Sequence, residues 1–374
     1  MPDREPVEKD CRWFPSGSAD PQNAGFVNSC TNNNAPHEAA RRKKLRLLAG
    51  LALALLAGIL FSISLGRFPV PIGEVVKILL SRVFPIEPTW EKNMEIAVLN
   101  VRLPRILLAC MVGCCLSCAG VSYQSIFHNA MAAPDILGAS SGACFGAALG
   151  ILLRRGSAVV TLLAFAFSLT TVAVVYLIGM RARGSRIVGI LLAGLTISSL
   201  FTAGTSYIKL AADPSDQLPA ITYWLMGSLS GVTMKEVLLA GIPMLIGGIV
   251  LFLLRWRINL LSLDDGEAQS MGVNIARMRL IVILCATLLT ASSVAVSGSI
   301  GWVGLIVPHI CRRLAGNDCR VLLPSSMLFG AIFLLIVDDL SRNLLATEIP
   351  IGILTAFVGA PFFIYLMTRK DVDL

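Results

Sequence analysis

Long apolar stretches dominate this sequence and constrain its fold more than any other feature. A helix needs about 20 apolar residues to cross a bilayer core of about 30 Å. The mean hydropathy is +0.76, and 55% of the residues are apolar. Nine runs have about the length of a span and carry no Asp, Glu, Lys or Arg in their middle third, at about 45–66, 103–123, 136–153, 158–180, 187–208, 236–255, 280–298, 321–341 and 349–368. The sequence therefore predicts an all-α, polytopic membrane protein.

A tenth span is expected where one uncharged segment is too long for a single helix. From Leu280 to Cys311 the chain carries no charge, and a helix pair that turns at Val296–Gly301 would add the short run Ser299–Ile310. With ten spans and both termini inside, 20 of the 31 Lys and Arg residues lie on the cytoplasmic side. This excess follows the positive-inside rule, so we predict ten transmembrane helices with cytoplasmic ends.

The ends of the chain differ from the apolar part. Residues 1–44 are polar, rich in Asn, Pro, Ser and Asp, and lack apolar periodicity. We predict a disordered cytoplasmic tail over 1–44, a transmembrane domain over 45–370 and a short cytoplasmic end over 371–374.

The spans lack the groups that would energise transport. Ion-coupled carriers use ionisable relays inside the membrane, and His309 is the single titrating candidate in these runs. The chain contains no G-x-x-x-x-G-K-[ST] phosphate-binding motif and no cluster of His, Asp and nucleophiles typical of a membrane enzyme. Its formal charge of +8 is explained by cytoplasmic loops and does not indicate nucleic-acid binding. The sequence therefore predicts that this chain is not itself an enzyme. An ATP-driven transport function would require a separate nucleotide-binding subunit, and the alternative is an ion-coupled secondary carrier.

Two stripes of small side chains recur at helical spacing. Cys110, Cys114 and Cys118 share one face and suggest a soft-metal site, but buried cysteine more often packs as a small hydrophobe, so no metal site is predicted. In the fifth span, small and hydroxylic residues at i+4 spacing favour close helix packing over a polar translocation path. They are Gly194, Ser198, Thr202 and Ser206.

Two arginines flank a Leu-Pro pair at the outer start of the second span, in VRLPR. The positive-inside rule disfavours cations at that end, so Arg102 and Arg105 need an explanation. Snorkelling at the interface is one interpretation. The other is a pair presented to a carboxylate, because Pro104 stiffens the helix start.

Several motifs together resemble one family. SGSIGWVGLIVPHICRRLAGNDCRVLLPSSMLFGA, residues 297–331, is similar to the signature of the FecCD permeases of ATP-binding-cassette (ABC) importers for iron–siderophore chelates, haem and cobalamin. VRLPR, HNAMAAPDILGASSGA, ITYWLMGSLSG, EAQSMGVNIARMR and IPIGILTAFVGAPFFIYLM match that family in the same order. The resemblance covers about residues 45–370 and implies a type II importer permease of about ten helices.

The resemblance also implies partners and a location. A member of this family forms a homodimer, or pairs with a paralogue, with a central path lined by the fifth and tenth helices. It works with two ATPase subunits, which bind ATP and Mg, and with a periplasmic or lipid-anchored substrate-binding protein. It resides in a bacterial or archaeal cytoplasmic membrane, among membrane lipid, and binds no cofactor itself. The expected cargo is an iron(III)–siderophore chelate, with cobalamin or haem as alternatives.

Site residues follow from the same resemblance. Arg102, Arg105 and Arg342 match arginines that meet glutamates of the binding protein, although Asp338 and Asp339 at i−4 and i−3 could instead neutralise Arg342 locally. The loop over about 259–279 resembles the element that transmits closure of the ATPases. Its expected coupling residues are Glu267, Ala268, Met271 and Gly272.

Overall fold

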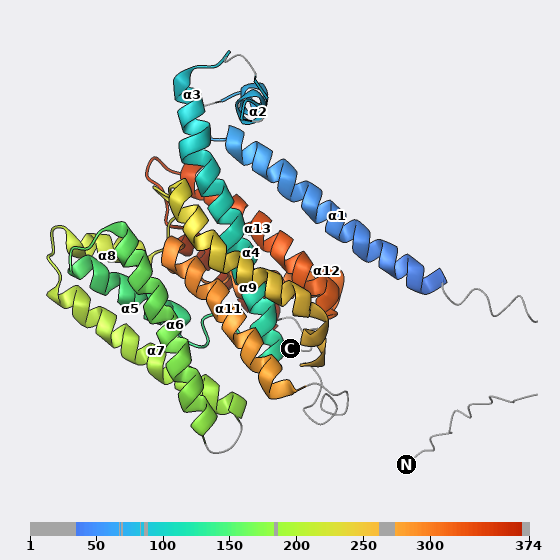
Figure 1. The fold of residues 1–374 in the computed structure, drawn as a ribbon, viewed down its shortest axis with the longest axis vertical. Helices are drawn as coiled ribbons and strands as arrows, with labels where there is room; N and C mark the ends of the chain where they lie inside the picture. The colour runs from blue at the N-terminus through green and yellow to red at the C-terminus, as the bar shows by residue number, and fades with distance from the viewer. Residues whose placement is uncertain are drawn as a thin grey trace, which may run out of the picture. The chain divides into compact units, whose positions relative to one another are not determined.

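The computed structural model describes residues 35–66, 68, 70–82, 84–85, 89–182, 186–261 and 274–368, and all regular elements within them are helical. The chain divides into two compact units, Met1–Leu45 and Arg46–Leu374, and the arrangement below is that of the second (Figure 1). The longer helices are α1 (Ala35–Ser64), α4 (Leu103–Phe127), α5 (Ala139–Leu152), α6 (Ser157–Arg181), α7 (Arg186–Ala211), α9 (Met234–Leu260), α11 (Ile275–Ser297), α12 (Val303–Ala315), α13 (Cys319–Asn343) and α14 (Ile351–Thr368).

A helix occupies each of the ten predicted runs, which confirms the all-helical fold class. Seven helices of the described chain are long and apolar enough to cross a membrane, and α5 and α14 are shorter apolar helices. The predicted turn at 296–301 is present, because α11 ends at Ser297 and α12 begins after Trp302. With 13 residues, α12 is about 20 Å long and too short to span a bilayer alone.

The second span begins earlier than the apolar run indicates. A short helix, α3 (Lys92–Ile96), and a π-helical segment, η3 (Ala97–Arg102), lead without a break into α4. The ring of Pro104 removes one N–H and crowds the carbonyl four residues earlier, which accounts for the widened turn before it. Two further short helices, α2 (Ile72–Leu80) and α8 (Gln217–Leu225), lie between the spans.

Helix α4 is the centre of the packing, since it contacts α9, α11, α12 and α13 (Figure 1). Glycines bring these backbones together: a Cβ on Gly113 would lie 2.2 Å from the carbonyl oxygen of Gly330 on α13. A Cβ on Gly120 would lie 1.9 Å from the carbonyl oxygen of Gly304 on α12. Small residues at the contact allow the backbone-to-backbone approach that is common between membrane helices.

Helices α5, α6 and α7 pack on one another, and α8 joins them through α5 (Figure 1). Helix α11 connects this group to the first, because it contacts α5 and α6 as well as α4 and α9. One face of α7 has no partner within the described chain and exposes large apolar side chains, among them Leu192, Leu195, Leu200, Tyr207 and Leu210.

Candidate functional site

Arg102 lies at the end of η3 and is buried against the end of α1. Its guanidinium donates to the carbonyl oxygens of Ile63 at 2.7 Å and Ser64 at 3.2 Å, and also to that of Phe68. A helix leaves its last carbonyl groups without intrahelical partners, and a cation there also interacts well with the helix dipole. Arg102 therefore fixes the end of α1 and the segment that follows it.

Arg105, one turn further along, is neutralised by acids more than 230 residues away in sequence. Its Nε donates to Asp338 Oδ1 of α13 at 2.9 Å, and its Nη1 donates to both carboxylate oxygens of Glu348, at 2.9 and 3.0 Å. The side chain of Asp338 is completely buried, and that of Arg105 is 7% exposed. No acid lies near Arg105 in the sequence, and these partners are brought to it only by the packing of α13 on α4.

Arg342 shows the local pairing that its spacing suggested. Its Nε lies 3.2 Å from Asp338 Oδ2, and its Nη2 contacts Asp339. The same Nη2 donates to Ser62 Oγ of α1 at 2.9 Å, and Ser62 donates to Asp339 Oδ1 at 2.6 Å. Asp338 is thus shared by two arginines, Arg105 and Arg342.

We call Ser62, Arg102, Arg105, Asp338, Asp339, Arg342 and Glu348 the arginine cluster. It joins the end of α1, the start of α4, the end of α13 and the segment before α14. Because buried charges are stable only when paired, the cluster fixes the positions of these elements relative to one another. Internal acids already hold Arg105 and Arg342, so a carboxylate of another protein would compete with them for these guanidinium groups.

The predicted stripe on α7 does not lie on one face. Gly194 is buried, and a Cβ there would lie 2.4 Å from the carbonyl oxygen of Ile136, whereas Ser198 is half-buried and Thr202 and Ser206 are exposed. Steps of four residues rotate by about 40° each around an α-helix, so the stripe turns by about 120° between its ends. The hydroxyls of Thr202 and Ser206 donate to carbonyl groups of their own helix, at 2.8 and 3.0 Å.

The expected coupling residues Glu267, Ala268, Met271 and Gly272 lie outside the described residues. The described residues just before this segment, at the end of α9, are hydrogen-bonded to the turn between α12 and α13. Asn259 donates to Asp318 Oδ1 at 2.9 Å and accepts from the main-chain N–H of Cys319 at 2.7 Å.

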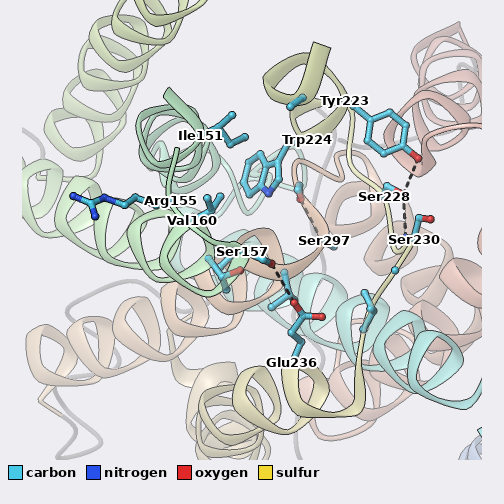
Figure 2. Close-up of a pocket in the computed structure, with 17 residues that line it drawn as sticks. Ile151, Arg155, Ser157, Val160, Tyr223, Trp224, Ser228, Ser230, Glu236 and Ser297 are labelled. Atoms are coloured by element: carbon cyan, nitrogen blue, oxygen red, sulfur yellow. Dashed lines mark hydrogen bonds between the residues drawn. The ribbon is translucent and has the colours of Figure 1, made fainter. Parts of the chain in front are cut away.

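A pocket that the sequence analysis missed lies among the ends of five helices. It has a volume of about 460 Å³ and is bordered by the end of α5, the start of α6, α8, the start of α9 and the end of α11 (Figure 2). Its lining includes one acid, Glu236, one base, Arg155, and two aromatic side chains, Tyr223 and Trp224. The one sequence signal was ITYWLMGSLSG, which places both aromatics before a serine-rich turn.

Comparisons with known proteins agree with this architecture. The model of the FecCD transport family matches residues 54–369. A molybdate import system permease protein of Haemophilus influenzae is 38% identical over 88% of this chain and 98% of its own. A Helicobacter pylori protein named as a probable iron chelatin transport system permease is 40% identical over 74% of this chain and 84% of its own.

A solved structure extends the likeness to three dimensions. An ABC transporter described as of metal-chelate type, in an inward-facing conformation, superposes with a TM-score of 0.77 and 37% identity. The superposition covers 86% of this chain and 98% of the other. The chain thus belongs to the FecCD transport family and is a multi-pass membrane permease of an ABC importer.

Proposed function

We propose that this chain is the permease subunit that passes an iron(III)–siderophore chelate through a cytoplasmic membrane, by alternating access driven by ATP hydrolysis on separate subunits. The observation that carries the proposal is the FecCD match over residues 54–369, supported by a relative named for iron chelatin and a structural neighbour of metal-chelate type. We infer that both termini lie on the cytoplasmic side, because most Lys and Arg residues fall on that side in the predicted ten-span topology.

The exposed face of α7 supports pairing of two permease subunits. Large apolar side chains there, such as Leu195 at 67% and Tyr207 at 72% exposure, alternate with the exposed hydroxyls of Thr202 and Ser206. A face of mixed apolar and hydroxylic groups is suited to helix packing and to a path that holds a bulky cargo weakly. A second copy of this chain, or a paralogue, would cover it.

The arginine cluster is proposed as the docking site for the glutamates of a binding protein. Glu348 is the most accessible acid of the cluster, with a side chain 30% exposed, and its carboxylate accepts from Nη1 of Arg105. We infer that Glu348 pairs with Arg105 in the free permease and that a glutamate of the binding protein replaces it on docking. Two copies of the cluster in a dimer would make the contact bivalent.

Glu348→Gln tests this docking role. Because the amide attracts the guanidinium less than a carboxylate does, the variant should release Arg105 and bind the substrate-binding protein about threefold to tenfold more tightly at low salt, within the range of a charge-assisted hydrogen bond. Surface plasmon resonance on the reconstituted transporter measures the affinity. An affinity that falls, or stays unchanged at low salt, would assign Arg105 a purely internal role.

The segment with Glu267, Ala268, Met271 and Gly272 is proposed to couple this chain to the ATPase. Gly272→Trp should leave hydrolysis of ATP intact and lower uptake at least about tenfold, because a bulky side chain at a packed protein contact prevents close fit. Hydrolysis and uptake are measured in the same proteoliposomes. Coupled transport that survives the change would remove this segment from the mechanism.

The cargo is decided by co-purification followed by uptake. The tagged chain, extracted gently, should carry a stoichiometric ATPase subunit whose hydrolysis a binding protein stimulates. Uptake of labelled iron–siderophore, molybdate, cobalamin and haem then ranks the substrates. Molybdate is included because the Haemophilus influenzae relative is matched over 98% of its length. Preference for molybdate, cobalamin or haem would replace the iron chelate, and absence of an ATPase partner would favour the secondary carrier.

A further inference from the structure

Two neighbouring cavities share a wall, on the side of the molecule that the distribution of Lys and Arg assigns to the outside. The first is the pocket of Figure 2, called the outer pocket here. The second, of about 340 Å³, lies between α6 and α9 and is called the side groove. Four residues line both cavities, which makes the two adjoin: Thr161, Glu236, Ala295 and Val296.

The side groove is suited to a hydrocarbon chain. Apart from Glu236, Thr161 and one serine, its lining is apolar, with Leu162, Phe165, Leu239 and Pro243 among its members. Leu162 and Leu239 are also 64% and 69% exposed on the surface of the chain. In a protein that spans a membrane, such leucines face the acyl chains of lipids. The side groove therefore opens toward the bilayer and not toward water.

The outer pocket, which adjoins the side groove, is lined by one acidic and one basic side chain. Glu236 Oε1 accepts from Ser157 Oγ at 3.3 Å, and Arg155 lines the edge of the pocket with its guanidinium directed away from Glu236 (Figure 2). The second oxygen of Glu236 accepts the N–H of Thr233 at 2.9 Å, as part of the cap that begins α9. The carboxylate is thus held in place within the pocket by contacts to two elements.

The aromatic residues place this pocket at the membrane surface. Tyr223 and Trp224 line it together, and these residue types concentrate at the level of lipid head groups. A lipid head group at that depth can pair with both charged side chains if it carries an ammonium, which would contact Glu236, and a phosphate, which would contact Arg155. A primary amine is required, because a quaternary ammonium has no N–H to donate to the carboxylate.

We propose that a phospholipid with a primary-amine head group, such as phosphatidylethanolamine, binds with its head in the outer pocket and one acyl chain in the side groove. The bound lipid would bridge α6, α8 and α9. This site is independent of the cargo and of the arginine cluster, so its test does not depend on the proposed function.

Native mass spectrometry of the full-length protein with defined lipids tests the head group. Phosphatidylethanolamine should bind about tenfold more tightly than phosphatidylcholine or phosphatidylglycerol, a factor that corresponds to about 1.4 kcal/mol. Glu236→Gln keeps a capping amide and Arg155→Gln keeps a polar side chain, and each should abolish most of that preference. Equal binding of the three lipids to the unchanged protein would overturn the proposal.

Matched variants separate the site from general charge effects. Arg154→Gln changes the neighbouring cation, which does not line the pocket, and Glu91→Gln removes an exposed acid at the start of α3. Both should retain the preference for phosphatidylethanolamine within about twofold, since screened surface charges contribute little. Loss of the preference in these controls as well would assign it to net charge and overturn the site.

A photoreactive lipid tests the groove in the unchanged protein, whatever the variants do to folding. Phosphatidylethanolamine with a diazirine on its acyl chain should label peptides of α6 and α9 most strongly, around Leu162, Phe165 and Leu239. Helix α1 provides the comparison, because its Leu53 and Leu56 are similarly exposed, at 69% and 60%, and line neither cavity. Equal labelling of α1, or no competition by unlabelled phosphatidylethanolamine, would contradict the proposal.

Discussion

Replacing Asp338 with alanine is expected to lower the free energy of unfolding by about 3 kcal/mol or more, the scale for removing one partner of a buried ion pair. The carboxylate is completely buried and lies 2.9 Å from Arg105 Nε and 3.2 Å from Arg342 Nε. Without Asp338, Arg105 keeps Glu348 and Arg342 keeps Asp339 as partners. The Nε atom of each arginine nevertheless loses its counter-ion, in a site that water does not reach. The contact of α13 with α4 at this end should therefore loosen.

The matched control for Asp338→Ala is an exposed ion pair of the same length. Arg82 Nη2 and Glu95 Oε1 are also 2.9 Å apart, but their side chains are 63% and 36% exposed. Glu95→Ala should cost at most about 1 kcal/mol, because water screens the pair and solvates the cation that remains. Thermal unfolding in one detergent compares both variants with the unchanged protein. Equal effects of the two changes would mean that burial does not set the strength of the Asp338 contacts.

The positions of the spans could be predicted from the sequence, because a membrane span is defined by local composition. An uncharged run of the right length has one stable form in a bilayer, a helix whose backbone hydrogen bonds are internal. The start of α4 could not be predicted in this way. Residues 92–102 are only partly apolar, and their helix continues from α4 through the widened turn before Pro104.

The partners of the arginines could be predicted only where they are local. Arg342 and its acids are three and four residues apart on one helix, so the spacing alone indicated the contact. Arg105 meets Asp338 across 233 residues, and Arg102 meets main-chain oxygens, which no side-chain pattern reports. The outer pocket was missed for the same reason, since three segments that are far apart in sequence form it, 151–161, 220–236 and 295–298.

Replacing Gly120 with alanine is expected to destabilise the protein by about 3 kcal/mol or to prevent folding, at or beyond the upper end for overpacked cores. The added Cβ would lie 1.9 Å from the carbonyl oxygen of Gly304 and 2.9 Å from its Cα. Both are main-chain atoms, so no side-chain rotation relieves the clash. Helix α12 cannot simply retreat, because Gly304 is itself packed against Pro134, where a Cβ would meet the ring at 2.2 Å.

Gly50→Ala is the control for this prediction, because it makes the same change in the middle of α1 with no heavy atom within 4 Å of the new Cβ. Alanine favours a helix over glycine by about 1 kcal/mol, so Gly50→Ala should leave stability unchanged or raise it. The yield of monodisperse protein and the unfolding temperature are measured for both. If Gly120→Ala behaved like Gly50→Ala, α4 and α12 would not be in backbone contact. A large loss of stability in Gly120→Ala but not in Gly50→Ala would show that contact with α4 determines the position of α12, a helix too short to span the bilayer alone.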